Sequence, residues 1–116
     1  MTQQNVIVLR IRKDQADEFE RGFADHQVPI WREYHAAGKF LSASLTRVEY
    51  GSPEAEREQD GIQVYLVLAH VPGMAEHSAH DSDPRFEKWL ELARRFQPEP
   101  PLVFGGERLQ QIGDAG

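Results

Sequence analysis

The chain has 116 residues, of which 40% are hydrophobic and 28% are charged; these values are typical of one globular domain. Its 13 Lys and Arg against 19 Asp and Glu give a formal net charge of −6, which argues against nucleic acid and an anionic membrane as partners, because both attract basic proteins. The absence of cysteine excludes disulfides, thiolate metal sites and a cysteine nucleophile, and suits a cytoplasmic protein. We expect a single domain over residues 1–116 with its core at about residues 5–112.

The N-terminal third of the chain predicts a strand followed by a helix. Asn5–Arg12 is rich in β-branched and apolar side chains, and this apolar stretch is too short for a signal peptide or a membrane span. Asp14 is a suitable N-cap for the helix. Its apolar side chains recur every three or four residues: Phe19, Phe23, His26, Ile30 and Tyr34. Because proline disrupts a helix interior, we expect a kink or break near Gln27–Val28, with Pro29 restarting the helix and Gly38 ending it.

The middle of the chain predicts two strands joined by an acidic connection. Apolar and polar residues alternate in the segment Phe40–Tyr50, which predicts the second strand. Residues 51–61 open with Gly-Ser-Pro, close with Asp-Gly and contain four acids, so we expect a solvated hairpin connection with one helical turn. The segment Ile62–Val71 is almost continuously apolar, which predicts a third strand that is buried on both faces.

The C-terminal third predicts a short helix, a longer helix and a last strand. We expect the short helix over Met74–His80. Asp83-Pro84 is a typical helix start, an N-cap followed by proline at the first helical position, and Arg85–Phe96 has an amphipathic pattern. The last strand is expected at about Leu102–Ile112, with Gly105-Gly106 forming a bulge.

This order of elements, βαββαβ, predicts an α+β, ferredoxin-like fold. Right-handed crossovers place both helices on one face of a four-stranded antiparallel sheet. The third strand nevertheless has apolar residues on both faces, with Leu66 and Leu68 on one and Tyr65 and Val67 on the other. An uncovered apolar sheet is unusual on a soluble monomer. We therefore predict a homodimer whose two sheets pack face to face.

The segment from His80 to Trp89 carries a resemblance to a known family. His80 is followed by Asp83-Pro84, then by the aromatic Phe86 and by Trp89. This run and the element order resemble the dimeric α/β-barrel superfamily, and most closely the antibiotic-biosynthesis-monooxygenase-like proteins. The resemblance implies a homodimeric barrel and a pocket between the helices and the sheet. Some members oxygenate aromatic molecules without metal or flavin, some degrade haem, and others bind small molecules with no known reaction.

The resemblance does not extend to haem degradation. Haem-degrading members have an asparagine, a tryptophan and a histidine where this chain has Ile7, His80 and Leu90. We therefore predict no cofactor. Two alternatives stay open. The first is cofactor-independent oxygenation of a small aromatic molecule. The second is a non-catalytic protein that either binds a small apolar molecule or is purely structural.

His80 is the candidate catalytic residue. The ordinary pKa of histidine suits proton removal from a phenol near neutral pH, although a histidine at a helix entry is often only a structural hydrogen-bond partner. The candidate pocket-lining residues are the aromatic or imidazole side chains that the same fold brings near it: Trp31, His35, Tyr65, His77, Phe86 and Trp89. At helical spacing such aromatic residues are also typical of a core.

A metal site is the remaining alternative. His77 and His80 share a helix face because they are three residues apart, and His70 ends the preceding strand. With Asp81, Asp83 or Glu76, these three imidazoles could ligate a transition metal. The spacing matches no strong metal motif, so we predict none and leave the possibility open.

Overall fold

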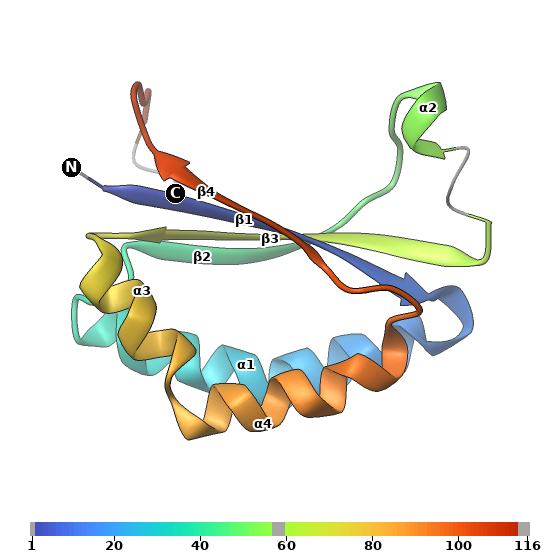
Figure 1. Ribbon diagram of the computed structural model, residues 1–116, viewed down its shortest axis with the longest axis horizontal. Coiled ribbons are helices and arrows are strands. Elements are labelled where there is room, and N and C mark those ends of the chain that lie inside the picture. Colours follow the sequence, from blue (N-terminus) through green and yellow to red (C-terminus); the bar gives the residue numbers. More distant parts are fainter. Residues whose placement is uncertain (1, 57–59, 114–116) are drawn as a thin grey trace.

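The structure, a computed structural model, describes residues 2–56 and 60–113. Four antiparallel strands form one sheet in the order β2-β3-β1-β4, and the two longest helices cover one of its faces (Figure 1). The fold class is therefore confirmed as α+β and ferredoxin-like. The strands are β1 (Gln3–Arg12), β2 (Ser42–Arg47), β3 (Ile62–Val71) and β4 (Leu102–Glu107). The helices are α1 (Ala16–Ala36), α2 (Pro53–Glu56), α3 (Met74–Asp81) and α4 (Pro84–Ala93), with 3-10 turns η1 (Lys13–Gln15) and η2 (Arg94–Phe96).

Strand β3 has the predicted bounds, whereas β2 and β4 are shorter than expected. The last strand was expected to reach Ile112, but β4 pairs only with β1, and that ladder ends where Gln3 lies opposite Glu107. Because β1 begins at Gln3, it has no further residue to pair with the segment that follows Glu107. The predicted bulge is also wrong, because Gly105 and Gly106 pair in regular register with β1. Gly105 instead allows a close approach, since an added Cβ would lie 3.0 Å from Asn5 Oδ1.

Helix α1 runs without a break through Pro29, so the predicted interruption near Gln27–Val28 is wrong. The proline is exposed, and α1 buries a continuous stripe against the sheet: Phe19, Phe23, Gln27, Ile30 and Tyr34. The packing of this stripe outweighs the one backbone hydrogen bond that proline cannot form. Asp14 does not cap the helix, because η1 precedes it. Gly38 ends it as predicted, with φ of 74° and its N–H donating to His35 O.

The predicted connections and helix starts around β3 agree with the structure. The acidic segment contains the one-turn helix α2, although residues 57–59 of the predicted connection lie outside the described residues. Asp83 is the N-cap of α4, and its Oδ1 accepts a hydrogen bond of 2.9 Å from Arg85 N. None of the helices among the described residues is both long and apolar enough to cross a membrane.

The two faces of the sheet have different surroundings. The face toward the helices carries the core, in which Ile11, Tyr65 and Val67 pack against α1 and α4. On the opposite side of the sheet, Figure 1 shows the one-turn α2 with its flanking segments at one end, and no helix longer than this among the described residues. The strand register places two rows of apolar side chains there: Val6, Leu68 and Phe104, then Val8, Leu66 and Leu102. Phe104 and Leu102 are 58% and 46% exposed.

Candidate functional site

A cavity of about 280 Å³ lies between the sheet and the helices. Side chains from β1, β3, β4, α1, α3 and α4 line it, and most are apolar or aromatic. The lining residues Leu90, Pro101 and Val103 are exposed, so the cavity reaches the surface between α4 and the edge strand β4. Six polar side chains contribute to its wall: Asn5, Gln27, His77, His80, Asp81 and Gln97.

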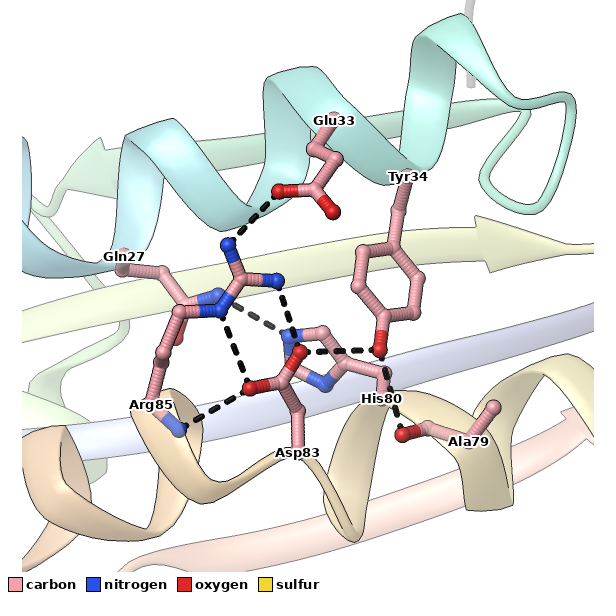
Figure 2. A network of polar contacts seen from close by, with 7 residues as sticks. All are labelled: Gln27, Glu33, Tyr34, Ala79, His80, Asp83 and Arg85. Atoms are coloured by element: carbon pink, nitrogen blue, oxygen red, sulfur yellow. Dashed lines mark hydrogen bonds and ion pairs between the residues drawn. The ribbon is translucent and has the colours of Figure 1, made fainter.

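His80 is the buried polar residue of α3, with 6% of its surface exposed. The rings of Tyr34, Phe40 and Phe86 surround it, with centroids 5.4, 5.0 and 4.3 Å from the imidazole. Gln27 Nε2 donates to His80 Nε2 over 3.0 Å, as Figure 2 shows.

The hydrogen bonds of His80 select one form of its ring. An amide nitrogen can only donate and a carboxylate can only accept. His80 Nδ1 lies 3.3 Å from Asp81 Oδ1, and its Nε2 faces the amide nitrogen of Gln27. Both contacts are satisfied by the neutral tautomer that carries its proton on Nδ1. The unprotonated Nε2 is therefore the nitrogen on the Gln27 side, at the wall of the cavity.

Asp81 connects His80 to a second imidazole at the cavity rim. Its Oδ2 lies 2.7 Å from His77 Nε2, and His77 Nδ1 lies 2.8 Å from Gln3 Oε1. Asn5 Nδ2 donates to the same Gln3 oxygen over 3.2 Å. Burial raises the pKa of the Asp81 carboxyl, but the hydrogen bond from His80 and the charge of His77 outweigh it, so the pKa lies below its usual value. The carboxylate is thus kept charged beside His80.

A network behind His80 ties α1 to the junction of α3 and α4 (Figure 2). The Tyr34 hydroxyl lies 3.1 Å from Asp83 Oδ2 and 3.2 Å from Ala79 O. Arg85 donates to both carboxylate oxygens of Asp83 and, over 2.6 Å, to Glu33. The hydrogen bonds from Arg85 hold the pKa of Asp83 far below its usual range, in spite of burial. Burial and the neighbouring Asp83 raise the pKa of Tyr34.

The structure brings five of the seven predicted site residues to the cavity: Trp31, His77, His80, Phe86 and Trp89. His35 is not in the lining. It lies at the end of α1, where its Nδ1 donates to Phe40 O over 3.0 Å, so its ring serves the turn that follows the helix. Trp89 is 4% exposed and stacks on His26, with ring centroids 5.5 Å apart.

Tyr65 is the other predicted residue outside the cavity. Its side chain is in the core, 1% exposed, and its hydroxyl donates to Glu20 Oε2 over 2.5 Å. Arg47 donates to the same carboxylate over 2.8 Å. Burial and the bond to Glu20 raise the pKa of Tyr65, which leaves the phenol neutral. Its polar end is directed to the α1–β2 edge instead of the cavity.

Gln27 was missed in the sequence, although it is the closest polar partner of His80. It lies four residues after Phe23 and three before Ile30, which places it on the buried stripe of α1. His26 was assigned to that stripe but is exposed. A glutamine in register with buried aromatic residues is the signal that could have identified it, because a buried amide requires a polar partner.

The three histidines do not form a metal site. Strand alternation places His70 on the sheet face away from the helices, whereas His77 and His80 are on the helix side. Within residues 2–56 and 60–113, no group of three or more histidine, aspartate or glutamate side chains could hold a metal ion. Burial, together with the nearby Arg108, lowers the pKa of His70.

No family model matches the sequence, and no curated protein matches it significantly. Solved structures match over nearly the whole chain. Two are described as putative antibiotic biosynthesis monooxygenases. The one from Caulobacter crescentus is 19% identical, covering 94% of this chain and 91% of its own, with a TM-score of 0.73. The one from Nitrosomonas europaea is 11% identical, covering 97% and 94%, with a TM-score of 0.74.

A further match is a variant of SnoaB, described as a cofactor-independent oxygenase from Streptomyces nogalater. It is 15% identical, covers 96% of each chain and has a TM-score of 0.71. At such identities the likeness concerns the fold and leaves the chemistry to the site. The chain therefore has the ferredoxin-like fold of antibiotic-biosynthesis-monooxygenase-like proteins.

Proposed function

We propose that this protein binds a small aromatic molecule in the cavity and oxygenates it without a cofactor, with His80 as the acid/base group. One observation carries the proposal: a buried histidine, held as the Nδ1–H tautomer by Gln27 and Asp81, forms part of the wall of an otherwise apolar and aromatic cavity. Similar structures include one described as a cofactor-independent oxygenase, which supports this reading of the fold.

The cavity wall favours a flat, apolar ligand. Trp31, Phe86 and Trp89 offer ring faces and edges for stacking. Three of the polar groups, His80, Gln27 and Asp81, lie together at the α3 end, whereas Gln97 follows η2, beyond the C-terminal end of α4. A ligand with one hydroxyl group and two fused rings therefore matches the distribution of polar and apolar atoms.

His80 Nε2 is placed to remove the phenolic proton of such a ligand. A phenol takes the place of the Gln27 amide as donor to Nε2, and Asp81 stabilises the imidazolium that forms. The electron-rich phenolate then reacts with O₂. For 1-naphthol the balanced reaction is C₁₀H₈O + O₂ → C₁₀H₆O₂ + H₂O: the ring carbon opposite the hydroxyl gains one oxygen atom as a carbonyl, and the other leaves as water. The phenol supplies all four electrons that reduce O₂.

The test follows O₂ uptake and naphthoquinone absorbance with 1-naphthol, under air, for the wild type and His80→Ala. We expect the rate to fall by about 10² or more in the variant, the usual contribution of a general base. His35→Ala is the matched control, because this imidazole bonds a backbone carbonyl outside the cavity. Equal rates in wild type and His80→Ala would remove His80 from the mechanism.

The alternative is a binding protein without catalysis, and the same cavity supports it. Binding of 1-naphthol without O₂ uptake, and with an affinity unchanged in His80→Ala, would identify this second function.

The proposal also includes a homodimer. The two apolar rows on the uncovered sheet face form the surface that a second copy would bury.

A further inference from the structure

A further hollow, of about 470 Å³, lies on the other side of α1, where this helix borders β2. We call it the α1–β2 groove. Ala24 and Val28 of α1 and Ala43 and Leu45 of β2 form its apolar part. At its polar edge Glu20 accepts hydrogen bonds from Arg47 and from Tyr65. The three polar groups therefore satisfy one another, and the rest of the lining is apolar except for Ser44.

Among the described residues, two line both the cavity and the groove: Phe23 and Trp31. They lie eight residues apart in α1, and their rings meet edge to face, with centroids 5.1 Å apart and planes at 72°. On α1 the cavity is bordered by Phe19 and Gln27, and the groove by Ala24 and Val28. The partition between the two hollows is thus one pair of aromatic rings.

Trp31 is the less firmly held member of this pair. Phe23 is 4% exposed and contacts the rings of Phe19 and Trp89 as well. Trp31 is only half-buried and packs against both core clusters from their margin. Contact with the ring of Phe23 and with the margins of the two clusters therefore keeps the indole between the cavity and the groove.

We propose that Trp31 is the end wall of the cavity and determines the greatest length of the ligand. Replacing the indole by a methyl group joins the cavity to the α1–β2 groove and admits longer fused-ring molecules. The ligand class rests on the function proposed above, whereas the wall is a property of the packing. The test therefore needs one measurement that requires no ligand.

Trp89 provides that measurement. It lines the cavity, and the chain contains two tryptophans, so Trp89 is the sole tryptophan in both Trp31→Ala and Trp31→Phe. Phenylalanine keeps an aromatic wall, whereas alanine removes it. We expect the acrylamide quenching constant of Trp89 to be about threefold larger in Trp31→Ala than in Trp31→Phe. Ala24→Leu adds a side chain at an exposed position of the groove and should reverse this increase when combined with Trp31→Ala.

Ligand length is measured with two probes, 1-naphthol with two rings and 1-hydroxypyrene with four. We expect Trp31→Ala to bind 1-hydroxypyrene at least tenfold more tightly than the wild type, and 1-naphthol less tightly, because the shorter ligand loses its contact with the indole. The gain should be lost in the double variant that also carries Ala24→Leu. Thermal unfolding of each variant verifies that it is folded.

The outcomes separate the two proposals. Equal quenching constants in Trp31→Ala and Trp31→Phe would contradict the proposal that Trp31 separates the cavity from the groove, whichever ligand binds. Different quenching constants without tighter binding of 1-hydroxypyrene would contradict the proposal that Trp31 determines the greatest ligand length. Failure of the wild type to bind 1-naphthol contradicts the proposed function, while the quenching comparison still decides whether Trp31 separates the two hollows.

Discussion

At the residue scale, the chemistry of the cavity depends on how His80 is held. A histidine that has two partners of opposite kind, one donor and one acceptor, has a single neutral tautomer that satisfies both. Gln27 and Asp81 are those partners. They come from different helices, α1 and α3, so the tautomer is a product of tertiary packing. Asp81 also carries the charge that would stabilise a protonated His80.

Replacing Asp81 with asparagine tests that charge. An amide oxygen can still accept from His80 Nδ1, so the ring keeps its orientation, but it cannot stabilise the imidazolium. We expect kcat for 1-naphthol oxygenation to fall by a factor of about 10 to 100, while the Kd of 1-naphthol stays within threefold of the wild-type value. Glu87→Gln, an exposed carboxylate of α4, is the control. An unchanged kcat in Asp81→Asn would show that the charge is not used.

Asp83 gives a prediction for acid stability. Its pKa is depressed in the folded protein by Arg85. The pKa of Asp83 is near 3.8 in the unfolded chain and lower in the folded protein. The charged carboxylate therefore stabilises the fold above pH 3.8, and this stabilisation is lost as the pH falls from there toward the folded-state pKa. Asn is also a good N-cap, so Asp83→Asn removes the charge and keeps the cap. We expect the variant to be about 1 kcal/mol less stable at pH 7.

The difference between the two proteins should shrink as the pH falls from 5 to 2, because the unfolded wild type takes up a proton at Asp83 in this range, whereas the folded protein, with its lowered pKa, does not. Urea unfolding at several pH values measures it. Other carboxylates titrate in both proteins and cancel in the comparison. A constant difference across this pH range would contradict the role of the Asp83–Arg85 pair.

At the element scale, the pairing of α1 with α4 depends on a glycine. Gly22 lies inside α1, and an added Cβ would be 2.9 Å from Cζ3 of the buried Trp89. Glycine to alanine in a helix interior normally stabilises by about 1 kcal/mol. Here the indole has little room to move, and overpacking costs about 1–3 kcal/mol.

We therefore expect Gly22→Ala to lower the free energy of unfolding by about 1 kcal/mol, against the usual direction of this change. Ala24→Gly, at an exposed position two residues along the same helix, isolates the intrinsic preference and should also cost about 1 kcal/mol. Chemical denaturation of both variants measures the two effects. A more stable Gly22→Ala would show that Trp89 yields without cost.

Elements were predictable where the local pattern and the tertiary packing agree. The continuous apolar run of β3 and the Asp83-Pro84 start of α4 have the expected places. The predicted helix break before Pro29 was wrong because burial of the α1 stripe outweighs the local effect of proline. The predicted end of β4 was wrong because the length of this edge strand is set by its neighbour β1, which lies far away in the sequence.

The same distinction applies to the site. Aromatic spacing brought Trp31, Phe86 and Trp89 to the cavity. Tyr65 shares the helix-facing side of β3 with cavity-lining Val67, yet its hydroxyl turns to Glu20 at the α1–β2 edge. Sequence alternation gives the face of a strand residue but not the partner at the end of its side chain. Gln27, by contrast, lies in register with the buried stripe of α1, so its burial was predictable from the sequence, whereas its partner on α3 was not.

At the scale of the whole molecule, the uncovered sheet face is the feature that a single chain leaves unexplained. Its two rows of three apolar side chains cross β3, β1 and β4. Each row ends on the edge strand, at Phe104 and Leu102, which are 58% and 46% exposed. Apolar rows on adjacent strands form a flat surface that a second copy, related by twofold symmetry, would cover with the same rows.

Phe104→Glu tests this assembly. In a single chain the new carboxylate would stay in water and cost little, whereas in a face-to-face dimer it would be buried without a partner. Native mass spectrometry at about 10 μM protein, a concentration at which standard-size interfaces are commonly occupied, should therefore give twice the chain mass for the wild type and the single mass for Phe104→Glu. Phe104→Ala should weaken the dimer less, because it removes contact area without adding charge.

Tyr50→Glu is the control, because Tyr50 is 83% exposed in the segment after β2 and lies outside both rows. This variant should leave the dimer intact, because a carboxylate at position 50 remains in water in both the single chain and the dimer. A wild type of single mass, or a Phe104→Glu variant that stays at twice the mass, would show that the apolar rows are not the dimer contact. The cavity opens on the opposite side of the sheet, beside β4 and α4, so binding of 1-naphthol by the monomeric variant would further show whether the site is complete in one chain.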